Sequence, residues 1–359
     1  MEKYAVDPSI TKAKTLHTDF YTDAIIFQQA KEKLFSSWQF IGDSDTLMTY
    51  GNCSPLTLLP GHLDEPLLLT KDSANELHCL SNVCTHRGNL LITEPCQAAH
   101  IRCRYHGRLF GLHGRFQSMP EFKDVEDFRS ANDNLPELPL LRWGKLLFTA
   151  LQPQTSVDPF AEMMQRLHWL PLDHFRFRPD LSKTYTVKAH WALYCENYLE
   201  GFHIPFVHAG LNAVIDYGSY TTELFRYSNL QLGIVKEGEE AFDLPSSSPD
   251  NGKMVAAYYF WLFPNMMFNF YPWGLSINVV NPVSIDSTKV FFYTYLWNES
   301  KYNRGAGSEL DKVEMEDEAV VEAVQKGVRS SLYKHGRYSV TREQGIHHFH
   351  RLISEHLSG

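Results

Sequence analysis

The chain has 359 residues, of which 43% are hydrophobic, and a formal net charge of −9 at pH 7. This length can bury a large core and predicts two domains, while the acidic balance argues against nucleic acid as a partner. Residues 1–22 are polar and hold no apolar run long enough for a signal peptide or a membrane span, so we expect a cytoplasmic protein that does not bind a membrane.

The N-terminal part is predicted to form a helical segment over residues 1–37. Thr22-Asp23 can cap a helix over Ala24–Trp38, in which apolar residues recur at helical spacing. Short apolar runs bounded by Gly, Pro, Asn and Asp then predict a small antiparallel β domain over residues 38–152. These runs are Leu56–Leu59, Leu67–Thr70, Glu76–Leu80, Ile101–Cys103 and Lys145–Leu151.

A second domain is expected over residues 153–359. The polar, proline-flanked segment Gln152–Asp158 is predicted to be a linker. Beyond it, strand-like runs alternate with helical stretches near 192–203 and 308–329, and Lys236–Lys253 is predicted to be a surface loop. The strand-like runs are Lys183–His190, Met254–Phe263, Leu275–Val280 and Val290–Trp297.

Two short motifs in the first domain carry metal-binding chemistry. Cys84-Thr-His86 and Cys103-Arg-Tyr-His106 supply two thiolates and two imidazoles. In a Rieske [2Fe–2S] cluster two Cys hold one iron and two His hold the other, so we expect Cys84 and Cys103 at the inner iron and both histidines near the surface. Two Cys and two His also suit a zinc ion, but zinc fingers usually group their ligands as Cys-x-x-Cys and His-x₃₋₅-His, which favours the cluster.

The second domain contains a candidate site for a single iron. Glu200 and His203 are three residues apart, which predicts one face at the end of a helix. Pro205 should stop that helix and let His208 turn back toward His203. Two histidines need only one carboxylate to form the facial triad of a non-haem Fe(II) oxygenase. A structural histidine pair is the alternative, and the Rieske motif favours iron.

The third ligand is sought in the acidic stretch Val313–Gly327. Its valines and alanines mark the buried stripe of an amphipathic helix, so most of its carboxylates are expected on a solvated face. His190, His347, His348 and His350 have no ligand spacing tied to either site, and we expect them to be packing or surface residues.

On these motifs the chain resembles the catalytic α subunit of Rieske non-haem iron oxygenases, from about residue 38 onward. The resemblance implies an α+β fold, with a small antiparallel Rieske domain and a larger catalytic domain in which helices cover an antiparallel sheet in a helix-grip arrangement. It also implies Asp317 as the carboxylate ligand, with Glu316 as the alternative. The matching stretches are residues 84–88, 103–107, 196–203 with His208, and 316–327.

The activity implied by this resemblance is oxygenation by a terminal oxygenase. A separate flavin and iron–sulfur reductase, with or without a ferredoxin, would pass electrons from NAD(P)H to the cluster. The cluster would relay them to mononuclear Fe(II), which activates O₂ and hydroxylates, demethylates or cleaves a small organic substrate. Related subunits form head-to-tail homotrimers. Glu200, where many relatives have Asp, is assigned the catalytic role of joining His203 to a neighbour's cluster histidine.

In having Glu at position 200, the chain also resembles the branch of the family that oxidises quaternary ammonium compounds such as choline, glycine betaine and carnitine. Aromatic residues are dense between Tyr258 and Trp297 and could form a cage for such a cation, although packing of a sheet against helices explains most single rings. We therefore favour a quaternary ammonium or related amine as substrate. The alternatives are an aromatic acid or aryl ether hydroxylase or dioxygenase and, more remotely, a Rieske electron-transfer protein.

Overall fold

The computed structural model describes residues 4–153 and 158–358, and residues 154–157 of the predicted linker lie outside this range. The chain forms two compact units, Ser36–Gln154 and a larger one that joins Met1–Phe35 with Thr155–Gly359. The helices predicted as a separate N-terminal segment thus belong to the larger unit. Within the described residues, no helix combines the length and the apolar character that crossing a membrane requires.

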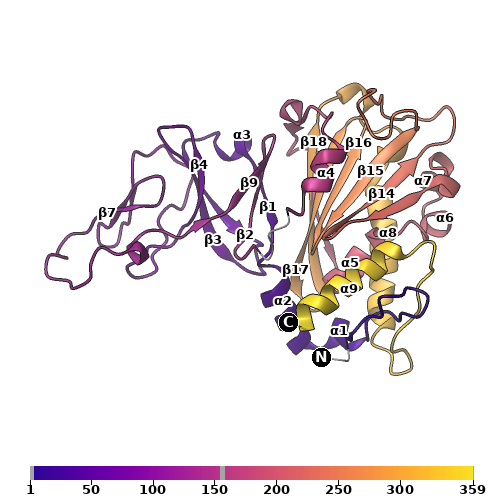
Figure 1. Ribbon diagram of the computed structural model, residues 1–359, viewed down its shortest axis with the longest axis horizontal. Helices are drawn as coiled ribbons and strands as arrows, with labels where there is room; N and C mark the ends of the chain where they lie inside the picture. Colours follow the sequence, from indigo (N-terminus) through magenta and orange to yellow (C-terminus); the bar gives the residue numbers. More distant parts are fainter. Residues whose placement is uncertain (1–3, 154–157, 359) are drawn as a thin grey trace. The chain divides into compact units, whose positions relative to one another are not determined.

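The smaller unit consists of three antiparallel sheets, drawn in indigo and purple in Figure 1. Its core contains Leu68, Leu80, Ile101 and Phe110, all fully buried. The sheets are β2-β3-β4-β8, β1-β10-β9 and β5-β6-β7. Their strands are β1 Gln39–Asp43, β2 Cys53–Leu58, β3 Glu65–Lys71, β4 Leu77–Ser81, β5 Ile101–Arg102, β6 Leu109–Phe110, β7 Phe116–Ser118, β8 Glu137–Leu138, β9 Leu140–Trp143 and β10 Leu146–Thr149, with the short helices α3 Ser44–Leu47 and η2 Ala131–Asp133.

The larger unit is built on one eight-stranded antiparallel sheet in the order β11-β18-β17-β16-β15-β14-β13, with β12 paired to β18. Helices α5, α8 and α9 lie over one face of this sheet (Figure 1). The predicted α+β class is confirmed. The strands are β11 Arg176–Phe177, β12 Lys183–Val187, β13 Thr221–Leu224, β14 Ser228–Ile234, β15 Val255–Leu262, β16 Met266–Tyr271, β17 Gly274–Ser284 and β18 Ser287–Leu296.

The helices of the larger unit are mostly short, apart from α2, α8 and α9. They are α1 Asp19–Thr22, α2 Ala24–Leu34, α4 Ala161–Arg166, α5 Trp191–Tyr198, α6 Ile204–Val207, α7 Ala209–Val214, α8 Leu310–Gly327 and α9 Gln344–Ser358, with 3₁₀ turns η3 Leu172–His174, η4 Tyr217–Ser219, η5 Glu299–Lys301 and η6 Gly305–Gly307.

Two predicted helices end earlier than expected. Asp23 caps α2 as predicted, since its side chain accepts the N–H of Ile25 at 2.8 Å. The helix stops at Leu34 rather than Trp38, because Trp38 already leads into β1. Likewise, α5 stops at Tyr198 rather than residue 203. Strands β14 and β16 and helix α9 have no counterpart among the predicted elements, since their burial depends on partners distant in sequence.

His190 caps α5 inside the core of the larger unit. Its ring is fully buried and lies 5.2 Å from Phe20, 5.6 Å from Tyr21 and 5.8 Å from Phe27, measured between ring centroids. Burial lowers the pKa of His190 to about 3, because an apolar environment disfavours the charged imidazolium. The folded protein therefore holds His190 neutral, whereas the unfolded chain takes up its proton below the ordinary histidine pKa.

We expect His190→Asn to weaken the acid sensitivity of folding. Stability is independent of His190 protonation above pH 6.5 and falls below it, by about 1.4 kcal/mol per pH unit. Between pH 7 and pH 5 the variant should therefore lose about 2 kcal/mol less unfolding free energy than the wild type. Urea unfolding at both pH values measures this. The exposed His168→Asn is the control, and equal pH dependence of wild type and His190→Asn would contradict the burial argument.

Candidate metal centres

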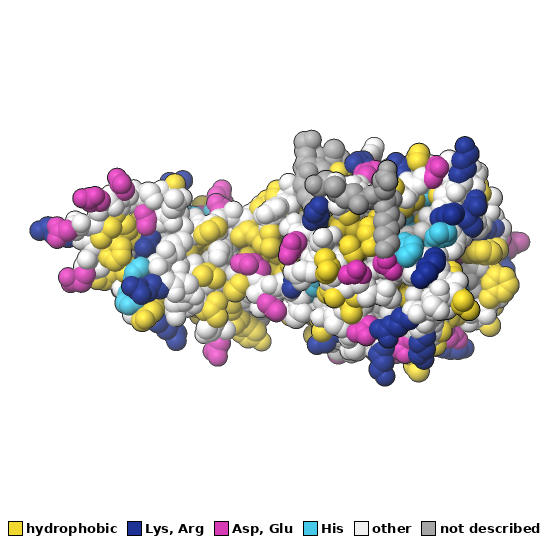
Figure 2. Space-filling view, turned by 90° about the horizontal axis from the view of Figure 1, so that it is seen from below, with side chains coloured by type: hydrophobic (Ala, Val, Ile, Leu, Met, Phe, Trp, Pro, Cys, Tyr) yellow, Lys and Arg dark blue, Asp and Glu magenta, His cyan; other side chains and the backbone are white. Residues whose placement is uncertain are grey.

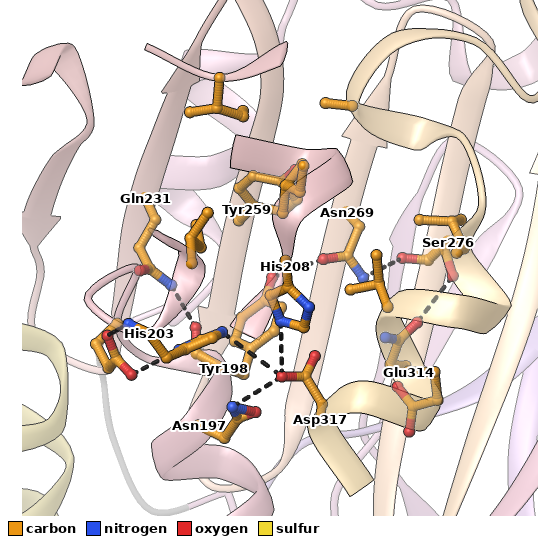
Figure 3. A pocket seen from close by; sticks show the side chains of 18 of the residues that line it. Asn197, Tyr198, His203, His208, Gln231, Tyr259, Asn269, Ser276, Glu314 and Asp317 are labelled. Carbon is orange, nitrogen blue, oxygen red and sulfur yellow. Dashed lines mark hydrogen bonds and ion pairs between the residues drawn. The ribbon is translucent and has the colours of Figure 1, made fainter. Parts of the chain in front are cut away.

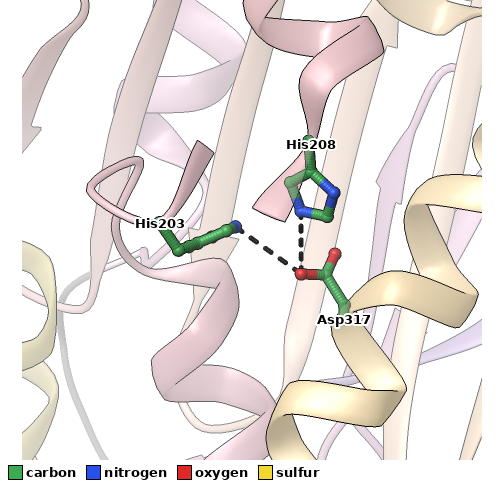
Figure 4. A group of neighbouring side chains, drawn as sticks. All are labelled: His203, His208 and Asp317. Carbon is green, nitrogen blue, oxygen red and sulfur yellow. Dashed lines mark hydrogen bonds and ion pairs between the residues drawn. The ribbon is translucent and has the colours of Figure 1, made fainter. Parts of the chain in front are cut away.

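Three predicted ligands meet in the larger unit (Figure 4). The candidate ligand atoms of His203, His208 and Asp317 all lie within 4.8 Å of one another. Nε2 of His208 is 2.9 Å from Oδ1 of Asp317, and Nε2 of His203 is 3.5 Å from the same oxygen. Asn197 on α5 also donates its Nδ2–H to this oxygen, at 3.0 Å. The arrangement presents two imidazole nitrogens and one carboxylate to a common point, which suits a divalent transition metal.

The local path of the chain differs from the predicted one. Glu200 and His203 do not lie on a helix, because α5 has already ended at Tyr198. They lie in the following turn, where the Glu200 carboxylate accepts the backbone N–H groups of Phe202 and His203. Pro205 stands in the first turn of α6, where a missing N–H costs nothing, so it begins a new helix rather than ending the old one. His208 follows at the end of α6.

Each histidine contacts a second carboxylate through its other ring nitrogen. Nδ1 of His203 is 2.6 Å from Oε1 of Glu200, and Nδ1 of His208 is 2.8 Å from Oε2 of Glu316. A carboxylate at Nδ1 holds the proton there and leaves the Nε2 lone pair directed at the common point. Glu316 and Asp317 therefore lie on opposite sides of the His208 ring, although they are adjacent in sequence.

Two pKa values reflect this concentration of carboxylates. Burial alone would lower the pKa of His208, but its hydrogen bonds to Asp317 and Glu316 outweigh burial and raise it. Burial raises the pKa of Glu314, which also lies on α8, to about 8, and the nearby Asp317 charge adds to the effect. Glu314 is 5% exposed, and both of its oxygens accept the Tyr194 hydroxyl, at 2.9 and 2.7 Å.

A pocket of about 120 Å³ opens beside His203, His208 and Asp317 (Figure 3). Its floor is a row of residues paired across four strands, in which Gln231, Tyr259, Asn269 and Ser276 occupy opposed positions and so share one face of the sheet. Five tyrosines and Phe292 line the pocket, together with Glu200, Glu314 and Asp317. Among the described residues, no lysine or arginine lines it. The tyrosines are Tyr194, Tyr198, Tyr220, Tyr259 and Tyr271.

The smaller unit holds the other four predicted ligands in two equivalent loops. In each loop the cysteine N–H donates to the carbonyl five residues on (Asn89 or Arg108), and its carbonyl accepts the N–H of a glycine four residues on. Both glycines, Gly88 and Gly107, have positive φ, of 67° and 77°, a conformation that favours glycine. The two loops therefore place Cys84 and Cys103 in the same backbone setting.

The side chains of these loops fit a two-iron cluster better than a single zinc ion. Cys84 and Cys103 are each 2% exposed, whereas His106 is exposed and its ring lies 4.8 Å from that of His86. Nδ1 of His86 is buried and has no hydrogen-bond partner in the described part of the chain. Within the described residues, these four side chains do not gather closely enough to form a single-ion site, as tetrahedral zinc would require.

Asp133 ties the two loops together. Its backbone carbonyl accepts the Thr85 hydroxyl at 3.0 Å and an Arg108 N–H at 3.1 Å, and its carboxylate accepts the same guanidinium at 2.6 Å. Arg108 is 2% exposed and packs on the ring of Phe116. No motif pointed to Asp133, because only the fold brings it to the loops. Asn197, in contrast, lies inside the motif at 196–203 and could have been named.

The surface beside the exposed histidine is basic. Arg87 and Arg104 are both exposed, and Figure 2 shows histidine and basic side chains together on the surface of the smaller unit. Tyr105 is 61% exposed and stacks on His106 with ring centroids 3.7 Å apart. One further group, Asp72, Glu76 and His78, lies close enough to hold an ion, but His78 already contacts Asp72 and Glu137.

Comparison with known proteins agrees with this geometry. Residues 37–129 match the Rieske [2Fe-2S] domain family, and residues 176–359 match the ring hydroxylating alpha subunit (catalytic domain) family. Choline monooxygenase of Arabidopsis thaliana is 28% identical, covering 98% of this chain and 85% of that protein. The carnitine monooxygenase oxygenase subunit of Escherichia coli K12 is also 28% identical, covering 99% and 96%.

Solved structures show the same fold. The quaternary ammonium Rieske monooxygenase CntA superposes with a TM-score of 0.74 at 22% identity, covering 98% of this chain and 99% of that one. Naphthalene 1,2-dioxygenase superposes with a TM-score of 0.69 at 16% identity, covering 97% and 93%. Because residues 176–359 match a catalytic domain, the alternative of a Rieske protein that only transfers electrons is not favoured. The chain belongs to the ring-hydroxylating α-subunit family and is a Rieske-type oxygenase, with a [2Fe–2S] cluster and a mononuclear iron as its cofactors.

Proposed function

We propose that this oxygenase hydroxylates a quaternary ammonium or related amine on carbon next to nitrogen, after which the carbon–nitrogen bond breaks and an aldehyde leaves. The pocket carries this proposal: ring faces and carboxylates surround it, and no lysine or arginine lines it among the described residues. Such a lining attracts a cation, whereas an aromatic acid would need a basic residue there. The relatives named choline and carnitine monooxygenase support the same class.

The ligand assignments belong to this proposal. His203, His208 and Asp317 would hold Fe(II), while Cys84, Cys103, His86 and His106 would hold the cluster. When bound, these groups supply O₂ activation and one-electron transfer. The chain itself positions the imidazoles: Glu200 and Glu316 hold a proton on Nδ1 of the two histidines. Asp317 is preferred over Glu316 because it lies on the Nε2 side of both rings.

The proposed protein partners follow from the number of electrons that the reaction consumes. Hydroxylation consumes O₂, two electrons and two protons, with one oxygen atom entering the C–H bond and the other leaving as water. We propose that an NAD(P)H-dependent flavin and iron–sulfur reductase delivers the electrons in the cytoplasm, directly or through a ferredoxin. We further propose a homotrimer in which Glu200 links His203 to a cluster histidine of the neighbouring copy. The structure of a related quaternary ammonium Rieske monooxygenase, described as giving insight into inter-subunit electron transfer, supports this arrangement.

Metal content tests the ligand assignment. Asp317→Ala should lose the mononuclear iron yet keep the visible absorbance and EPR signal of the cluster, because the two sites use separate residues. His106→Ala should do the reverse. Glu316→Gln is the matched control, since its amide oxygen can still accept from Nδ1 of His208, and it should keep the iron with affinity weakened by at most about tenfold. Iron retained in Asp317→Ala and lost in Glu316→Gln would reverse the assignment.

Glu200→Gln tests the link between the centres. The variant should keep both metals and a reducible cluster, yet turnover should fall by about tenfold to a hundredfold, because a neutral amide holds the His203 proton less firmly. Single-turnover measurement of cluster reoxidation, with substrate and O₂ present, locates the loss in electron transfer. Cluster reoxidation at the wild-type rate would remove this role from Glu200.

A substrate screen tests the proposed function itself. Reductase-driven O₂ uptake should rise at least about tenfold with choline, glycine betaine or carnitine analogues, with an aldehyde formed in step with the O₂ consumed. Benzoates and phenylpropanoids form the comparison panel. If only that panel stimulates uptake, the aromatic-acid alternative replaces the amine substrate.

A further inference from the structure

Glu314 is a buried carboxylate that has no counter-ion among the described residues. It lies on α8, lines the pocket and is 5% exposed. Its two oxygens accept only the hydroxyl of Tyr194, at 2.7 and 2.9 Å, among the residues that the structure describes. Within the same residues, no lysine, arginine or histidine forms an ion pair with it. A carboxylate in this setting is costly to ionise unless a cation joins it.

Glu314 lines the pocket, so a cation that pairs with it would be part of a molecule bound in the pocket. Figure 3 shows Glu314 and Asp317 projecting from the same helix beside the pocket. Residues three apart on a helix are neighbours on its surface, so a cation held near Glu314 lies close to the point shared by His203 and His208. Tyr194, which hydrogen-bonds Glu314, also lines the pocket and adds a ring face.

This inference rests on the proposed function. We propose that Glu314 is the charge partner of the substrate's quaternary nitrogen, and that it selects quaternary ammonium alcohols over quaternary ammonium carboxylates. A quaternary nitrogen has no N–H to donate, so its recognition depends on ring faces and on a nearby negative charge rather than on hydrogen bonds.

The selectivity follows from the rest of the lining. A substrate carboxylate would meet Glu200, Glu314 and Asp317 without a lysine or arginine to offset them, among the described residues. A hydroxyl group meets neutral polar side chains instead, since Asn278 and Ser276 also line the pocket. Buried like charges disfavour the wrong partner strongly, so this lining discriminates by repulsion as well as by attraction.

A purely structural role for Glu314 is the competing explanation. The hydrogen bond from Tyr194 joins α5 to α8 and could serve only to hold the two helices together. The two roles respond differently to substitution. Glu314→Gln keeps an oxygen that accepts from Tyr194 but removes the charge, whereas Tyr194→Phe removes the hydrogen bond and keeps the charge.

Calorimetric binding to the metal-loaded enzyme without O₂ separates them. The probes are choline, glycine betaine and 3,3-dimethylbutan-1-ol, in which carbon replaces the charged nitrogen of choline. The wild type should bind choline at least about tenfold more tightly than the other two. Glu314→Gln should weaken choline binding by about tenfold or more and leave the neutral alcohol within about twofold of the wild type.

Two further variants complete the experiment. Glu322→Gln, on the same helix outside the pocket, removes an equal charge and should leave all three affinities unchanged. Tyr194→Phe should preserve the preference for choline over its neutral analogue. Thermal unfolding of each variant reports whether it is folded.

Three results would overturn the inference. If choline binds Glu314→Gln as tightly as the wild type, Glu314 is not its charge partner, although the proposed function stands. If glycine betaine binds the wild type as tightly as choline, the selectivity is wrong. If none of the quaternary compounds binds the wild type, the proposed function fails together with this inference.

Discussion

The site of the larger unit depends on one carboxylate oxygen, Oδ1 of Asp317. Asn197 contacts it from α5, and His203 and His208 contact it from the segment that follows. Because α8 and α5 are far apart in sequence, this oxygen is where the two halves of the site are joined. The other ring nitrogen of each histidine contacts Glu200 or Glu316. Each imidazole is thus held between two carboxylates, and both Nε2 atoms face the same point.

This use of carboxylates shapes the pocket as well as the metal centre. Glu200, Glu314 and Asp317 all line it beside His203 and His208, and no lysine or arginine of the described chain lines it. A metal ion held by His203, His208 and Asp317 would offset part of this negative charge. Tyrosines lining the same pocket supply polarisable ring faces that favour a cation without neutralising the carboxylates. The proposed preference for a cationic substrate therefore follows from the same carboxylates that surround the candidate metal site.

In the smaller unit, backbone geometry positions the candidate cluster ligands. Its two loops repeat one hydrogen-bond pattern around Cys84 and Cys103, and a glycine with positive φ closes each. The thiolates are thereby buried while His106 stays exposed next to basic residues. Asp133 fastens the loops from outside both motifs through Thr85 and Arg108. A buried, well-fixed sulfur side and an accessible histidine side suit a centre that receives electrons at the surface.

The sequence by itself determined the candidate metal ligands that stand in short motifs, because spacing within a loop is a local property. Cys84, His86, Cys103, His106, His203 and His208 could all be named that way. The sequence did not decide whether Glu316 or Asp317 is the carboxylate ligand, because it does not show in which direction two adjacent side chains of a helix point. The tertiary structure places the two carboxylates on opposite sides of the His208 ring.

The tertiary structure alone decided which aromatic residues face the pocket. Tyr259 and Tyr271 line it, whereas Trp261 packs on Phe349 of α9, a helix that the sequence did not predict. Sheet register and the helices covering the sheet set these surroundings. Both arise from contacts between residues distant in the chain, which local pattern and spacing do not encode.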